Sequence, residues 1–243
     1  WSRATIRETQ LWGIFRENTM ALEIIGFPRS NFVRTVCMVA REKGVDYDLT
    51  PAMPHSDEDR AIHPMGQIPV MRHDGLELAE SQAIARYIDD SFDGAPMIPR
   101  DPRAAAPVNQ WISMTASSVD QLLMRRYVVE YAFHKDDDGN VVRTEIDKAI
   151  KRFPRMFAML EAAVAPGFLG SDSFSMADCF LVPILSAARS FPEGEAALAG
   201  SPALTAYFEK IAARPSFVDT APCPIIRITG LWPSMRARTA SLS

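Results

Sequence analysis

The feature that most constrains this sequence is a change of pattern near residue 100. Before it, short apolar runs typical of strands alternate with segments of helical periodicity. After it, only helical periodicity remains. The two regions are separated by residues 91–107, which are rich in Pro, Gly and Asp and indicate a linker. The chain therefore predicts a mixed α/β domain followed by an all-α domain.

The first region has a definite order of predicted elements. A strand–helix–strand unit implies two parallel strands, and a hairpin around Asp74-Gly75 adds antiparallel strands. Ser30 is a good N-cap for the first helix, and Gly44 is a good terminator. The predicted elements are a strand at 22–27, a helix at 30–44, a strand at 45–50, a hairpin of 68–71 with 76–78, and a helix from Glu80-Ser81.

The second region predicts a bundle of about five helices. Ser175-Met-Ala-Asp178 has the spacing of an N-terminal capping box. The helical patterns cover about 103–133, 143–164, 175–190 and 202–213. We expect residues 1–19 to be a disordered tag or upstream extension, 20–92 the first domain, 93–107 the linker, and 108–243 the helical domain with a C-terminal extension.

Composition excludes several classes of protein. The 243 residues carry 26 Lys and Arg against 30 Asp and Glu, a net charge of -4, which argues against a nucleic-acid partner. The longest apolar run, residues 179–185, is too short to cross a membrane. The three cysteines form no disulfide pattern, which favours a reducing, cytoplasmic location. The histidines and cysteines lack the spacing of a zinc site, so we expect no metal.

Four motifs together resemble the cytosolic glutathione transferases. His63-Pro-Met-Gly-Gln-Ile-Pro-Val70, followed by Asp74-Gly75 and residues 78–88, resembles the glutathione-binding half of that family. Residues 26–36 resemble the active-site loop of its serine-type, phi and theta-like branches. Ser175-Met-Ala-Asp178 and residues 213–217 match its helical domain, so the resemblance covers about 22–217. It implies a thioredoxin-like first domain, an all-α second domain, glutathione as a substrate, a homodimer and a role in detoxification.

The resemblance also implies a glutathione site in the first domain. Pro69 would follow a cis peptide bond and turn the backbone of Ile68 toward the peptide, which then pairs like an added strand. Glu80 and Ser81 would bind the γ-glutamyl end at a helix N-terminus. Gln67 and His55 would reach the glycyl end. The alternatives are a trans proline at a strand start, a helix-capping pair, and exposed loop residues.

Ser30 is the candidate catalytic residue. Its hydroxyl could donate a hydrogen bond to the glutathione sulfur and favour the thiolate, the reactive form. Three alternatives stay open: simple N-capping by Ser30, or activation by Asn31 or by a backbone N–H. His63, where the family usually has asparagine, is expected to hold its loop.

The electrophile site is the least determined part of the prediction. With Phe32, it would be built from Trp111, Met114 and Ser118, which share a helix face with Leu122. Ordinary core packing explains the same spacing. The leading hypothesis is a transferase that conjugates glutathione to a small electrophile. The alternatives are a glutathione-dependent disulfide reductase or isomerase, and a non-catalytic glutathione-binding module.

Overall fold

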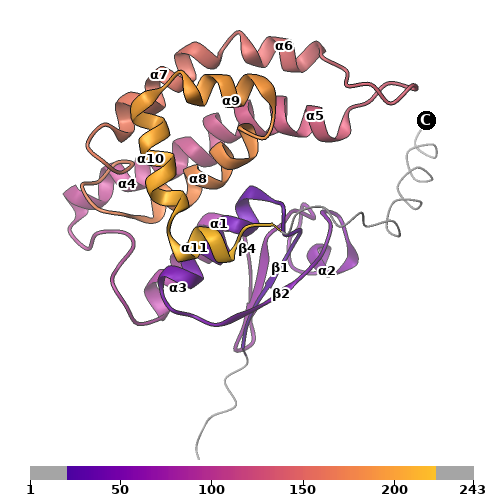
Figure 1. Cartoon of the computed structure of the whole chain (residues 1–243). Coiled ribbons are helices and arrows are strands. Elements are labelled where there is room, and N and C mark those ends of the chain that lie inside the picture. Colours follow the sequence, from indigo (N-terminus) through magenta and orange to yellow (C-terminus); the bar gives the residue numbers. More distant parts are fainter. Residues whose placement is uncertain (1–20, 223–243) are drawn as a thin grey trace, which may run out of the picture.

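The computed structural model describes residues 21–222, which form a sheet-containing part and a helical part stacked on it (Figure 1). The predicted extension at 1–19, and the tail beyond residue 222 with Trp232, lie outside the described residues. None of the helices within 21–222 is long and apolar enough to span a lipid bilayer.

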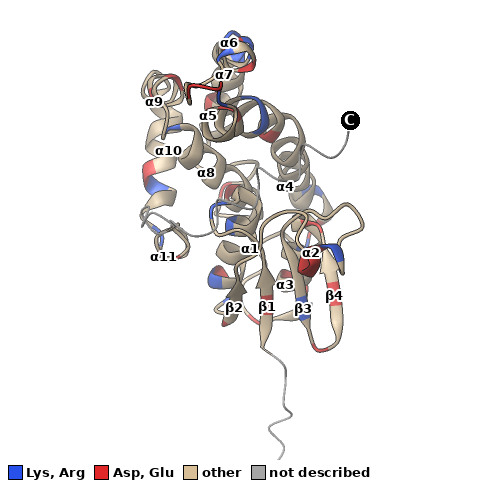
Figure 2. Cartoon of the chain, turned by 90° about the vertical axis from the view of Figure 1, so that its right-hand side faces the viewer, with Lys and Arg blue, Asp and Glu red and all other residues tan. Residues whose placement is uncertain are grey.

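The first part is built on a four-stranded sheet. Its strands are β1 (Leu22–Ile25), β2 (Tyr47–Thr50), β3 (Val70–His73) and β4 (Leu76–Ala79). They lie in the order β2-β1-β3-β4, side by side in Figure 2. β1 is parallel to β2 and antiparallel to β3, and β3 and β4 form the hairpin. The predicted strand–helix–strand unit followed by a hairpin is confirmed.

Three helices accompany this sheet. They are α1 (Asn31–Glu42), α2 (Asp57–Arg60) and α3 (Ser81–Ser91). α1 buries an apolar face that includes Val33, Val36 and Ala40, and the chain turns at Gly44 with φ of 66°. The four-residue helix α2 was not predicted, because it is too short to show helical periodicity. Its acidic first turn, after Ser56 as N-cap, favours a helix locally.

The second part contains helices only among its described residues, apart from one isolated bridge between Lys135 and Val141. Its elements are α4 (Pro102–Met114), the π-helix η2 (Thr115–Val128), α5 (Val129–Phe133), α6 (Thr144–Ile150), α7 (Phe153–Val164), α8 (Met176–Ala188), α9 (Pro192–Ala199), α10 (Pro202–Ala212) and α11 (Pro215–Asp219).

This part differs from the predicted bundle in three ways. The predicted helix at 103–133 is continuous, but its middle is π-helical. α9 and α11 are short helices that begin at prolines and lie outside the predicted segments. The predicted helix at 143–164 is divided into α6 and α7. α4 begins at Pro102, one residue before the predicted start, where Asp101 caps it by accepting from two backbone N–H groups.

Helix α8 is the centre of the helical core and supports the first part. Its N-terminus has the predicted capping box, in which Asp178 accepts from the backbone of Ser175 and from the Tyr207 hydroxyl. α1 packs on α8, and the Thr35 hydroxyl donates to the carbonyl of Cys179 over 2.9 Å. The helical part therefore helps fix the position of α1, whose N-terminus carries Ser30.

Candidate active site

The register of the sheet brings three predicted segments to the same edge. Ile25, the last residue of β1, lies opposite Val70, the first residue of β3. Val70 in turn lies opposite Ala79, the last residue of β4. The loop to Ser30, the Ile68-Pro69 dipeptide and the Glu80-Ser81 pair therefore all leave the sheet at that edge.

The Ile68–Pro69 bond is cis, as the resemblance implied. Ile68 lies against Gly26, since a Cβ added to Gly26 would come within 3.2 Å of the Ile68 Cβ and 2.5 Å of a Val33 methyl carbon. A side chain at position 26 would thus separate α1 from Ile68. Glycine at this position lets the end of β1, the first turn of α1 and the cis dipeptide pack together.

Ser30 is the N-cap of α1. Its backbone is extended, and its Oγ accepts from the N–H of Val33 over 3.5 Å. A hydroxyl that accepts one hydrogen bond still has its proton to donate. The first turn of α1 contains no acidic residue, so the positive end of the helix dipole is not offset within the helix. N-capping and activation of a thiolate are therefore compatible roles for Ser30.

Asn31 is directed toward the helical part. It is buried, and its Nδ2 donates to Asp120 of η2 over 3.1 Å. Asp120 also accepts from Arg125 over 2.9 Å, and the Arg125 guanidinium lies 6.0 Å from the centre of the Phe32 ring. Burial raises the pKa of Asp120, opposed by Arg125 and Asn31. The Asn31 carboxamide is thus oriented by Asp120, and this contact uses one of its two N–H groups.

Glu80 and Ser81 begin α3, but not as a capping pair. Glu80 has φ of 72° and ψ of 119°, and its side chain caps no N–H of α3. Its Oε1 lies 3.2 Å from Nε2 of His63. Ser81 is buried, whereas the Glu80 side chain is 69% exposed. The strained backbone of Glu80 presents a carboxylate beside the free N–H groups of a helix N-terminus.

The loop before the cis bond places His55 beside Gly66, the residue that precedes Gln67. The His55 N–H donates to the Gly66 carbonyl and to Asp59 Oδ2, each over 2.9 Å. A Cβ on Gly66 would lie 2.8 Å from the ring of His55. His55 and Gln67 are both exposed, as residues that bind a ligand from one side would be.

The predicted electrophile face does not continue along its helix. Trp111 is half-buried and packs against Gly170, where a Cβ would lie 2.7 Å from its ring. Met114 is half-buried, Ser118 is exposed and Leu122 is buried. The helix becomes π-helical at Thr115, and a π-helix has more residues per turn than an α-helix. The spacing from Trp111 to Leu122 therefore no longer defines one face.

Other residues from the helical part approach α1 instead. Phe32 is half-buried, and its ring centre lies 6.3 Å from that of Phe180 in α8. Asp120 and Arg125 reach the same region from η2. Neither charged residue was predicted, because their contacts with Asn31 and Phe32 join segments that lie far apart in the sequence.

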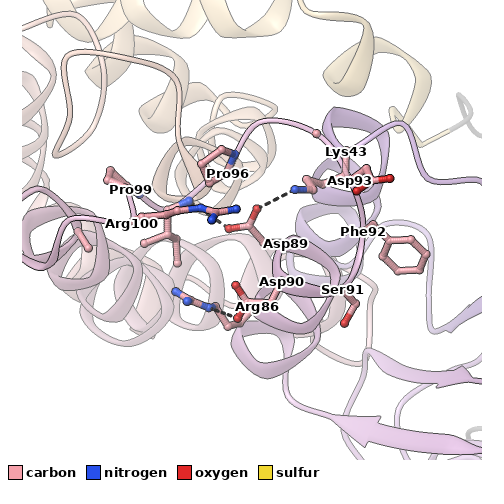
Figure 3. Close-up of a pocket in the computed structure, with 13 residues that line it drawn as sticks. Lys43, Arg86, Asp89, Asp90, Ser91, Phe92, Asp93, Pro96, Pro99 and Arg100 are labelled. Atoms are coloured by element: carbon pink, nitrogen blue, oxygen red, sulfur yellow. Dashed lines mark hydrogen bonds and ion pairs between the residues drawn. The ribbon is translucent and has the colours of Figure 1, made fainter.

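A polar cavity of about 460 Å³ lies elsewhere, at the C-terminal end of α3 and the linker (Figure 3). It contains a buried ion pair of Lys43 with Asp89, 3.2 Å apart, and Asp89 also accepts from the N–H groups of Met97 and Ile98. None of the predicted glutathione residues lines it. Its polar contacts attach the linker to the first part. Within 21–222 no three His, Cys, Asp or Glu residues are grouped to hold a metal ion.

The chain is similar to known proteins in both of its parts. The model of the glutathione S-transferase N-terminal domain matches residues 24–96, and that of the C-terminal domain matches 143–210. Glutathione S-transferase 3 of Zea mays is 30% identical over 217 residues, covering 82% of this chain and 92% of that protein.

Two further relatives extend this comparison. The probable maleylacetoacetate isomerase 2 of Drosophila melanogaster is 28% identical over 159 residues, covering 61% of this chain and 66% of that protein. The theta class glutathione S-transferase of Xanthomonas axonopodis pv. citri, solved with glutathione bound, is 25% identical with a TM-score of 0.69, covering 82% of this chain and 96% of that one.

Proposed function

The chain belongs to the glutathione S-transferase family and is a glutathione transferase, and on this premise we propose that it activates glutathione at Ser30 and conjugates it to a small electrophile. The observation that carries the proposal is the shared sheet edge. Ser30, the cis Ile68–Pro69 bond and the Glu80-Ser81 pair leave the sheet where β1, β3 and β4 are in register.

In the proposed complex, glutathione lies along this edge. The backbone of Ile68 pairs with the cysteinyl residue, and the N-terminus of α3 with Ser81 binds the γ-glutamyl carboxylate. Glu80 faces the ammonium group of that residue, while Gln67 and His55 lie toward the glycyl end. This order brings the thiol toward Ser30 at the N-terminus of α1.

The proposed chemical step is attack by a thiolate. Glutathione loses its thiol proton to solvent, and the Ser30 hydroxyl and the α1 dipole stabilise the sulfur anion. The sulfur electron pair forms a bond to the electrophilic carbon. In a substitution, the leaving group departs with its bonding electrons; in an addition, the resulting carbanion takes a proton from solvent. Ser30 remains a hydrogen-bond donor throughout and forms no covalent bond.

The disulfide reductase alternative is disfavoured by the state of the described cysteines. A reductase that cycles a cysteine of its own needs that thiol to be accessible and ionised. Cys37 is buried, and burial raises its pKa to about 11. Cys179 is fully buried, and burial raises its pKa well above the ordinary value. The isomerase alternative uses the same glutathione site. Its support is the similarity to the probable maleylacetoacetate isomerase 2 of Drosophila melanogaster.

The decisive variant is Ser30→Ala. We expect kcat with a chloronitroaromatic electrophile to fall about 10²-fold, because one donor to a developing anion is lost. The pKa of enzyme-bound glutathione, followed by the ultraviolet absorbance of the thiolate, should rise in parallel. Wild-type turnover by Ser30→Ala would remove Ser30 from the mechanism. Absence of glutathione binding to the wild-type protein in calorimetry would instead favour a non-catalytic module.

Three finer properties belong to this proposal. We propose a homodimer, a cytoplasmic location and a role in detoxification, as is typical of the family that the chain resembles. Light scattering on the purified protein tests the first: the mass of two chains is expected, and a monomer would contradict it.

A further inference from the structure

We infer that His63 is a positioning residue for glutathione, acting through Glu80; this inference rests on the proposed function. His63 comes after α2, 17 positions before Glu80 in sequence. It is 5% exposed, although it lies in a loop. A buried histidine with both ring nitrogens engaged has its ring orientation determined by those contacts.

The two ring nitrogens have different roles. Nδ1 accepts from the backbone N–H of Met65 over 3.0 Å, so the proton of the neutral ring is on Nε2. Nε2 lies 3.2 Å from Oε1 of Glu80 and donates to it. One imidazole thus connects the loop that leads to the cis Ile68–Pro69 bond with the carboxylate at the start of α3.

Glu80 needs such a partner because no other residue in the described part of the chain holds its side chain. Within residues 21–222, His63 is the only group that forms a hydrogen bond with the Glu80 carboxylate. The side chain is 69% exposed, and an exposed glutamate loses rotamer freedom when it binds a ligand. By holding Oε1, His63 lowers this entropic cost and leaves Oε2 free for the ligand's ammonium group.

The loop before Ile68 is anchored by backbone contacts as well. The His63 N–H donates to the Asp59 carbonyl over 2.7 Å, and the His63 carbonyl accepts from Gly66 over 2.8 Å. Gly66 in turn accepts from His55. Since these contacts do not involve the imidazole, the loop keeps much of its support when the ring is replaced.

Two replacements separate the two roles of the ring. In His63→Asn, the amide oxygen can still accept from the N–H two residues on, a common use of asparagine, but the shorter side chain does not reach Glu80. In His63→Gln, the amide nitrogen can take the place of Nε2 and donate to Glu80, whereas the contact to Met65 is lost. The first variant removes the proposed function of His63, and the second retains it.

The experiment measures the dissociation constants of glutathione and of its analogue without the amino group. We expect His63→Asn to weaken glutathione binding about five-fold, as suits one partly exposed hydrogen bond to a charged group, and to leave analogue binding unchanged. His63→Gln should bind both like the wild type. At saturating glutathione, kcat should be unaffected in both variants, and thermal denaturation checks that each is folded.

The double variant His63→Asn/Glu80→Gln completes the test. If His63 acts through Glu80, adding His63→Asn to Glu80→Gln should weaken glutathione binding little further. Equal losses for glutathione and the analogue, or fully additive losses, would show that His63 only supports the loop and would overturn the inference. Unchanged glutathione binding in His63→Asn would overturn the inference about His63 and leave the proposed function intact. A wild-type protein that binds no glutathione would overturn both.

Discussion

Helices α1 and α3 both begin at the same edge of the sheet, yet their N-termini are built differently. At α1, Ser30 has an ordinary extended backbone with φ of -65°, and its own side chain caps the helix. At α3, Glu80 has φ of 72°, and its side chain contacts His63 in place of the helix. In the proposed complex the first terminus faces the sulfur and the second faces the γ-glutamyl group.

The difference shows how each end depends on the rest of the chain. The α1 terminus is specified locally, because the cap and the candidate donor are one residue. The α3 terminus requires a strained backbone and a partner from a separate loop. Strain of this kind persists where the surrounding contacts hold the backbone in place, and it is concentrated at functional sites. In the proposed complex, the α1 terminus therefore serves stability and chemistry together, whereas the strained α3 terminus serves binding at a cost in stability.

Ser30→Gly, compared with Ser30→Ala, tests the first half of this contrast and has the largest expected effect. Both variants lose the hydroxyl, so kcat should fall about 10²-fold in each. Alanine at an N-cap costs about 1 kcal/mol of stability, whereas glycine costs a few tenths. Enzyme assays and denaturant unfolding measure the two quantities. A glycine variant with wild-type turnover would show that the hydroxyl is only a cap.

The contrast also explains which features were predictable from sequence. The strands, α1 and the hairpin follow from local periodicity and turn residues, and so does the Ser30 cap. The cis bond and the roles of Glu80 and Ser81 came from resemblance to a family, not from local pattern. His63 was expected to hold its loop, but its contact with Glu80 depends on how the loop folds back on the sheet edge.

The contribution of the helical part was harder to foresee. Asn31 and Asp120 are 89 positions apart, so no local pattern connects them. The residues of η2 have an ordinary helix-forming composition, and no pattern in their sequence predicts a π-helix from Thr115 to Val128. The change of helix type rotates later side chains relative to Trp111, a rotation that the regular α-helical spacing of the prediction does not include.

The second prediction concerns the backbone of Glu80. Its φ of 72° and ψ of 119° are unfavourable for a residue with a Cβ and accessible to glycine. Both Glu80→Gly and Glu80→Ala lose the contact to His63, so the difference between them isolates the backbone. We expect the glycine variant to be more stable by about 1 kcal/mol in denaturant unfolding, although both bind glutathione more weakly. A more stable alanine variant would mean that position 80 is not strained.

The smallest expected effect comes from the charge that the helical part places beside α1. Burial raises the pKa of Asp120 above 3.8, so the folded state holds this proton more tightly than the unfolded chain does. The contribution of Asp120 to stability therefore decreases as the pH rises from 3.8 through its folded pKa. Asp120→Asn cannot ionise, and its single amide oxygen replaces the two carboxylate oxygens that accept from Asn31 and Arg125. This loss lowers stability at every pH, so the test is the trend with pH and not the level.

The melting temperature of Asp120→Asn relative to the wild type should therefore increase as the pH rises through that window. Thermal denaturation of both proteins from below pH 3.8 to neutrality measures the difference. Gln121→Ala on η2, which replaces an exposed and uncharged residue, is the matched control and should show no such trend. Parallel curves for Asp120→Asn and the wild type would mean that Asp120 ionises as it does in the unfolded chain. In that case the charge of Asp120 would have no measurable effect on the N-terminus of α1. That terminus would then depend on its own Ser30 cap and not on the electrostatics of the helical part.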